Sequence, residues 1–124
     1  MVGRAALTVG SIVYIKDVIP PNSGQPKNRR VVIVDGLNVD ESFSFAVIAT
    51  RRNPSGELAP NEVIIPHKLG GHPQTSLTQP SVVVCTWVQE CSIDRALEKM
   101  GTCPVNVLKD VLDCILECDR RLTK

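Results

Sequence analysis

Basic side chains gather beside two turn-forming stretches of the chain, and their chemistry suits contact with phosphate. Residues 20–26 are rich in Pro, Asn, Ser and Gly, and a second basic turn spans residues 51–56. A guanidinium stays protonated and offers forked donors to two phosphate oxygens. Such cations can line a groove for the backbone of a single nucleic-acid strand, and solvated loop charge is the competing explanation for each. The candidates are Lys27, Arg29, Arg30, Arg51, Arg52 and Lys68.

Histidine and tryptophan side chains are the other candidates for such a site. His67 and His72 flank a Gly-Gly pair in a predicted loop, and imidazole is well matched to proton transfer near neutral pH. A loop histidine is more often simply exposed, so we assign neither of them to catalysis. Trp87 can stack on a base, but it is the only Trp and lies in an apolar run, which favours the core or a dimer interface.

The cysteines favour packing over metal binding. They contain no C-x-x-C pair, and their odd number suits a reducing compartment. Two of them, four residues apart, share a predicted helix face, but no histidine lies beside them to complete a zinc site. We therefore expect no metal or other cofactor, and we expect the thiols to act as small buried hydrophobes. They are Cys85, Cys91, Cys103, Cys114 and Cys118.

Length and charge set the scale of the protein. A chain of 124 residues suits one domain, which we place at residues 1–124. Its formal net charge of +1 is too small to hold a polyanion, so a nucleic-acid site must be a local patch. The N-terminal residues lack the apolar region of a secretory signal, and no apolar run matches a membrane span. We expect a soluble, cytoplasmic protein with no membrane partner.

Five strands and two helices are predicted to position these residues. Alternating or β-branched runs predict strands at residues 11–16, 31–34, 43–50, 62–65 and 81–88. Ser92 is an N-cap candidate for a short helix that Gly101 would end. After Pro104, apolar residues recur at helical spacing and predict a terminal amphipathic helix. Short, evenly spaced strands followed by a helix are typical of a small β barrel, a mainly β (α+β) fold.

In order and spacing, the chain resembles the MazF/PemK/Kid toxin family from Gly10 to about the end of the terminal helix. The family's first strand, Gly-rich loop, Arg-Pro-plus-apolar strand, strand ending in Thr, penultimate strand and following helix each have a counterpart. The matching segments are residues 10–14 (GSIVY), 24–25 (GQ), 29–34 (RRVVIV), 47–50 (VIAT), 81–84 (SVVV) and 93–97 (IDRAL).

The resemblance implies an SH3-like small barrel of the MazF/PemK/CcdB type that forms a homodimer. It implies a type II toxin that cleaves single-stranded RNA at short sequences without metal and is inhibited by an antitoxin protein. By position, it assigns catalysis to Arg29 and Thr50.

Three positions depart from the family pattern. Arg30 replaces the usual Pro, and Val84 and Thr86 stand where the Kid branch has Arg and Asp. Two alternatives therefore remain open: a non-catalytic binding protein of the same fold, and an inhibitor of a protein target such as gyrase.

Overall fold

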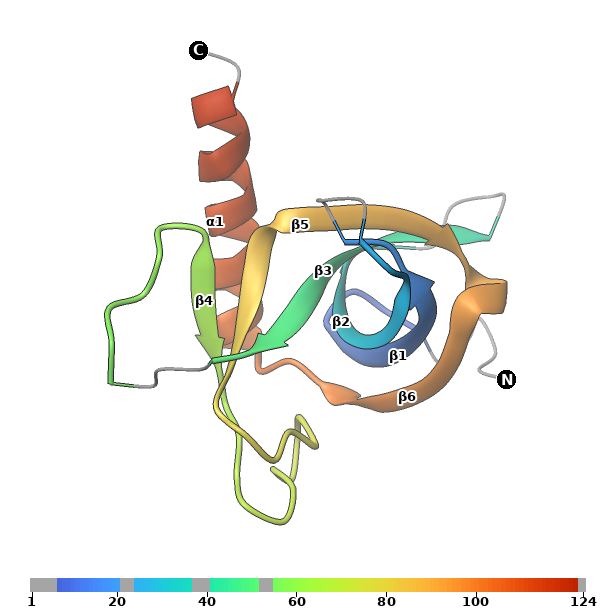
Figure 1. The fold of residues 1–124 in the computed structure, drawn as a ribbon, viewed down its shortest axis with the longest axis horizontal. Helices are drawn as coiled ribbons and strands as arrows, with labels where there is room; N and C mark the ends of the chain where they lie inside the picture. The colour runs from blue at the N-terminus through green and yellow to red at the C-terminus, as the bar shows by residue number, and fades with distance from the viewer. Residues whose placement is uncertain (1–6, 21–23, 37–40, 52–54, 123–124) are drawn as a thin grey trace.

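The structure is a computed structural model that describes residues 7–20, 24–36, 41–51 and 55–122, with side chains to residue 119. Figure 1 shows a strongly curved sheet with one long helix standing against it. The sheet has six antiparallel strands in the order β4-β5-β3-β2-β1-β6. The elements are β1 (Ser11–Val18), β2 (Lys27–Asp35), β3 (Ser42–Thr50), β4 (Glu62–Ile65), β5 (Ser81–Ser92), a 3-10 helix (Ile93–Arg95), β6 (Ala96–Thr102) and α1 (Val105–Leu122).

The two faces of this sheet bury two separate apolar clusters. Strand alternation sends Val13 and Ile15 of β1 to one face and Ile12 to the other, as the sequence predicts. We call the first the inner cluster because the sheet curls around it, and it contains Phe43 and Phe45. The helix-side cluster lies beneath α1, which contributes Val107, Val111 and Cys118. Both clusters pack on the same strands. The sheet is curved like a barrel, but its edge strands β4 and β6 do not pair with each other within the described residues.

The segment after β5 differs from the prediction. The short helix expected from Ser92 to Gly101 is only the 3-10 helix Ile93–Arg95, with Ser92 Oγ accepting a hydrogen bond from the Asp94 N–H at 3.3 Å. The chain then enters β6, which pairs with β1. Residues 96–100 (ALEKM) are good helix formers, but the free edge of β1 offers them a ladder of backbone hydrogen bonds. Tertiary pairing therefore overrides local propensity here.

The basic cluster at Lys27 to Arg30 also differs from the prediction. The sequence places it at the end of a loop, whereas the structure includes it in β2, with Arg29 paired to Ile15 and Arg30 to Tyr14. Its side chains consequently alternate between the two faces of the sheet.

The remaining elements lie where the sequence predicts them. The other four predicted strands are present, and the terminal helix begins directly after Pro104. No helix among the described residues is long and apolar enough to cross a membrane.

Candidate functional site

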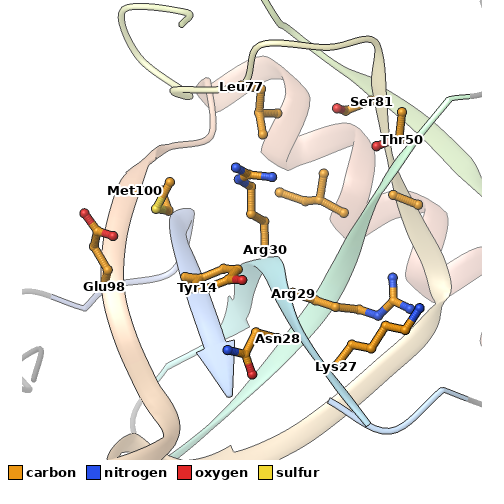
Figure 2. A pocket seen from close by; sticks show the side chains of 12 residues that line it. Tyr14, Lys27, Asn28, Arg29, Arg30, Thr50, Leu77, Ser81, Glu98 and Met100 are labelled. Atoms are coloured by element: carbon orange, nitrogen blue, oxygen red, sulfur yellow. The ribbon is translucent and has the colours of Figure 1, made fainter. Parts of the chain in front are cut away.

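A pocket of about 610 Å³ opens on the helix-side face near the end of β3. Figure 2 shows the pocket across β3, β2, β1 and β6, with the segment between β4 and β5 at its upper wall. The lining residues are Tyr14, Lys27, Asn28, Arg29, Arg30, Ile48, Ala49, Thr50, Leu77, Ser81, Glu98 and Met100.

Arg30 and Thr50 lie on the same face of the sheet. The register pairs Val32 with Ala46, so residues two apart from each, Arg30 and Ile48, also share that face. Thr50 continues it and is paired with Ser81 of β5. Figure 2 shows Arg30 extending into the pocket and the Thr50 and Ser81 hydroxyls at its upper right. This corner therefore holds an exposed guanidinium and two hydroxyls.

Arg29 lies on the other face, although it too lines the pocket. Its guanidinium carbon is 4.9 Å from the centroid of the Trp87 ring, a cation–π arrangement. Trp87 packs against the inner cluster. Arg29 Nε and Trp87 Nε1 are both buried and make no hydrogen bond with the described residues. The structure thus brings Arg29 and Thr50 to one pocket, but it directs the Arg29 guanidinium to Trp87, and the guanidinium on the face of Thr50 is that of Arg30.

The other predicted cations divide between the pocket and its surroundings. Lys27 is exposed and lines the pocket beside Arg29 (Figure 2). Lys68 is exposed in the segment between β4 and β5 and is not among the lining residues. Arg51 Nη2 donates a hydrogen bond to the Gly56 carbonyl oxygen. Arg52 lies outside the described residues.

Several lining residues escaped the sequence analysis. Glu98 and Met100 are on β6, where the sequence pattern predicts a helix, so that pattern gave no reason to expect them beside Tyr14. The register sets Tyr14 directly opposite Arg30 on one side and Glu98 on the other. Only the pairing of β1 with both neighbours reveals this row, because Glu98 is 84 positions from Tyr14 in the chain.

Neither histidine lines the pocket. His67 is exposed, whereas His72 Nδ1 accepts hydrogen bonds from the backbone N–H groups of Gln74 and Thr75 at 3.1 and 3.2 Å. The Thr102 N–H donates to the Gln74 carbonyl oxygen at 2.8 Å, which fastens this turn to β6. Since Leu77 lines the pocket, His72 supports the pocket wall through the backbone.

The cysteines are packing residues, as the sequence predicts. Cys85, Cys91, Cys103 and Cys118 are buried, and Cys114 is half-buried with its Sγ 3.5 Å from the Pro60 carbonyl oxygen. Burial raises the pKa of Cys103 to about 11 and raises the pKa of Cys85, where the neighbouring Cys114 adds to the effect. These thiols therefore stay protonated near neutral pH.

Charge and hydrogen-bonding capacity define what the pocket can bind. The lining residues in the described part of the chain include three cationic side chains, Lys27, Arg29 and Arg30, and one carboxylate, Glu98. The excess of cations is local, because the whole chain has a formal charge of only +1. The Ser81 hydroxyl already donates to the Gln79 carbonyl oxygen at 2.8 Å, so the donors left at this corner are the Arg30 guanidinium and the Thr50 hydroxyl. Both are suited to the oxygens of a phosphodiester.

Comparison with solved structures shows the same fold in known toxins. The MazF toxin of Deinococcus radiodurans has a TM-score of 0.67 at 19% identity, over 90% of this chain and 94% of that one. Toxin MazF-mt6 of Mycobacterium tuberculosis has a TM-score of 0.61 at 19% identity, over 88% and 96%. A MazE–MazF complex from Deinococcus radiodurans gives a TM-score of 0.64 at 16% identity, over 90% and 93%. Among curated protein sequences, none matches this chain.

A family model matches the sequence over nearly its whole length. Residues 8–118 fit the model for the PemK-like, MazF-like toxin of type II toxin–antitoxin systems. The match begins just before β1 and ends within α1, so it spans all six strands and most of the helix. The chain therefore belongs to the PemK-like, MazF-like toxin family of type II toxin–antitoxin systems.

Proposed function

We propose that this toxin is an endoribonuclease that cleaves single-stranded RNA without a metal ion in the pocket on β2 and β3. The observation that carries the proposal is the corner where the Arg30 guanidinium and the Thr50 hydroxyl share one face of the sheet. A structural neighbour with a TM-score of 0.63 at 14% identity, over 90% of this chain and 89% of that one, is described as an endoribonuclease from Mycobacterial species.

The chemistry requires positioning and charge stabilisation. The 2′-hydroxyl of a ribose gives up its proton and its oxygen bonds to the adjacent phosphorus in line, which forms a 2′,3′-cyclic phosphate. The bond from phosphorus to the 5′-oxygen of the next nucleotide breaks, and that oxygen takes up a proton. Charge accumulates on the non-bridging oxygens, where a guanidinium and a hydroxyl donor stabilise it. Thr50 supplies the hydroxyl, and the two adjacent arginines are the candidates for the guanidinium.

The arginines differ in what supports them. Family resemblance favours Arg29 as the catalytic residue, while strand geometry favours Arg30. Lys27 adds positive charge beside these two arginines, where the RNA backbone would pass. Arg51, Arg52 and Lys68 remain proposed contacts to the flanking backbone of the RNA.

The proposed partners follow from the family. Solved MazE–MazF complexes among the structural neighbours support an antitoxin partner. We propose that its acidic segment is disordered when free and folds across the cation-lined pocket. We also propose that the toxin is a homodimer and acts in the cytoplasm.

The first prediction tests cleavage directly. Micromolar protein should cut a single-stranded RNA in EDTA, and Thr50→Val should slow cleavage by about 100-fold or more because a donor to the developing charge is lost. The same assay on Arg29→Ala and Arg30→Ala identifies the essential guanidinium, with circular dichroism to check folding. Gel mapping of the RNA ends gives the rates.

Thr78→Val is the matched control, since Thr78 is exposed and does not line the pocket. RNA that stays intact with folded wild-type protein would contradict the nuclease proposal. Binding of that RNA without cleavage would support the non-catalytic alternative, and inhibited supercoiling would support a gyrase-type inhibitor. Induced expression in a bacterium, with growth arrest as the readout, tests toxicity separately.

A further inference from the structure

Among the described residues that line the pocket, Glu98 is the single carboxylate beside several cations and hydroxyls. It is exposed on β6 and makes no hydrogen bond or ion pair with any described residue. An ionised carboxylate accepts hydrogen bonds and donates none, so it repels the phosphates that the rest of the pocket attracts. Within the pocket, Glu98 can accept hydrogen bonds from a ligand group that donates them.

The position of Glu98 argues against a role at the phosphorus atom. Arg30, Tyr14 and Glu98 lie opposite one another on three adjacent strands, β2, β1 and β6. Two strand spacings amount to about 10 Å, whereas a general base must lie within about 3 Å of the proton that it removes. Thr50 is one strand farther away, on β3. Glu98 therefore lies at a distance suited to a base whose phosphate is at Arg30.

Tyr14 occupies the space between these two charges. It is half-buried, and Figure 2 shows it between Arg30 and Glu98, with Met100 above it. Its side chain likewise makes no hydrogen bond with the described residues. Aromatic rings in such positions stack on the bases of single-stranded nucleic acids. The row thus offers a phosphate contact, a stacking ring and an acceptor, in that order.

We propose that Tyr14 and Glu98 form a base-recognition subsite for guanine, next to the phosphate held at Arg30. The inference rests on the proposed RNA substrate. Guanine is the base whose pairing edge presents two adjacent donors, N1–H and the N2 amino group, and a carboxylate can accept both in a bidentate contact. Adenine and cytosine present one amino group beside an acceptor nitrogen, which the carboxylate would repel. Uracil presents one N–H between two acceptor oxygens.

The test measures binding without cleavage. Oligouridine with 2′-O-methyl groups cannot be cut, and one central position is varied among guanine, hypoxanthine, adenine and uracil. Fluorescence anisotropy at fixed salt should show about tenfold tighter binding of the guanine probe than of the adenine or uracil probe, with hypoxanthine, which lacks the amino group, in between. Glu98→Gln should remove most of this preference, and it should bind the uracil probe slightly more tightly than wild type does, because a charge that repels phosphate is lost.

Two further variants separate specificity from affinity. Glu90→Gln, an exposed carboxylate on β5 outside the pocket, should keep the full preference. Arg30→Gln should weaken all four probes alike and lower the salt dependence, as expected of a phosphate contact. Equal binding of all probes by wild-type protein, or an unchanged preference in Glu98→Gln, would overturn the subsite and leave the RNA proposal standing. Wild-type protein that binds none of the probes at low salt would overturn both.

Discussion

At the scale of single residues, Arg29 and Arg30 show how adjacent side chains acquire different surroundings. Both belong to β2, and alternation places Arg30 on the open face of the pocket and the Arg29 guanidinium on Trp87. A buried N–H without a partner costs about 1–3 kcal/mol, and Arg29 Nε and Trp87 Nε1 are two such groups among the described residues. The residue that resemblance assigns to catalysis is therefore the more constrained of the pair.

The second prediction concerns the buried thiol of Cys103. Its pKa rises from 9.0 to about 11 on folding because burial disfavours the thiolate. Below pH 9 the thiol is neutral in both states and this contribution to stability is fully present. Between pH 9 and 11 the unfolded chain releases the proton and the folded chain keeps it, so the free energy of unfolding falls as pH rises, by about 1.4 kcal/mol per unit between the two pKa values.

Urea unfolding of wild type and Cys103→Ala at several pH values measures this effect. The variant should be less stable than wild type below pH 9, and its stability should decline less between pH 9 and 11. If the free energy of unfolding falls equally with pH in wild type and Cys103→Ala, the pKa of Cys103 is not raised by folding.

At the scale of secondary-structure elements, β6 shows which contacts select a strand where the local sequence favours a helix. Gly101 was expected to end that helix, yet it lies opposite Ile12 in the ladder with β1. A Cβ built there would clash with the Gln74 carbonyl oxygen and lie 2.9 Å from the Thr75 carbonyl carbon. Glycine at this position thus permits the turn that carries His72 to pack directly on β6.

The third prediction follows from that close approach. Gly101→Ala should lower the free energy of unfolding by about 1–3 kcal/mol, since two backbone segments must separate to admit a methyl group. Gly36→Ala is the matched control, because the nearest atom would be 3.9 Å away, an ordinary contact. Urea midpoints give both values. Equal midpoints for the two variants would show that the turn and β6 are not held at this separation.

At the scale of the whole molecule, one sheet supports both apolar clusters. Phe45 is buried on the inner face and Val111 of α1 on the helix-side face, and the strands between them belong to both. If the sheet unfolds on one side, the apolar side chains on its other face become exposed as well. This arrangement favours a single domain that unfolds as a unit.

The fourth prediction tests this cooperativity with two spectroscopic probes. Trp87 fluorescence reports the inner cluster, and circular dichroism reports α1. Phe45→Leu and Val111→Ala should each lower stability by about 1–3 kcal/mol and move both signals to the same lower midpoint. Separate midpoints for the two signals, in wild type or in either variant, would contradict a single cooperative domain.

Local patterns in the sequence determined much of the fold. Alternation and β-branched runs predicted β1, β3, β4 and β5, and helical spacing predicted α1, because each signal reflects burial of one face of one element. The same signals failed for β6 and for the start of β2. Both segments form strands because their backbones pair with β1. For β6 this partner is distant in the sequence, and local propensity carries no information about such pairing.

Only the tertiary structure decided how the candidate site is assembled. The resemblance to the toxin family made Arg29 and Thr50 candidates, and the neighbouring cations were candidates because their side chains suit phosphate. The sequence could not identify the Tyr14–Glu98 pair, whose members are neighbours only through the β1–β6 register. Nor could it decide which arginine faces Thr50, because a shift of one residue in where β2 begins reverses the face of every side chain on it.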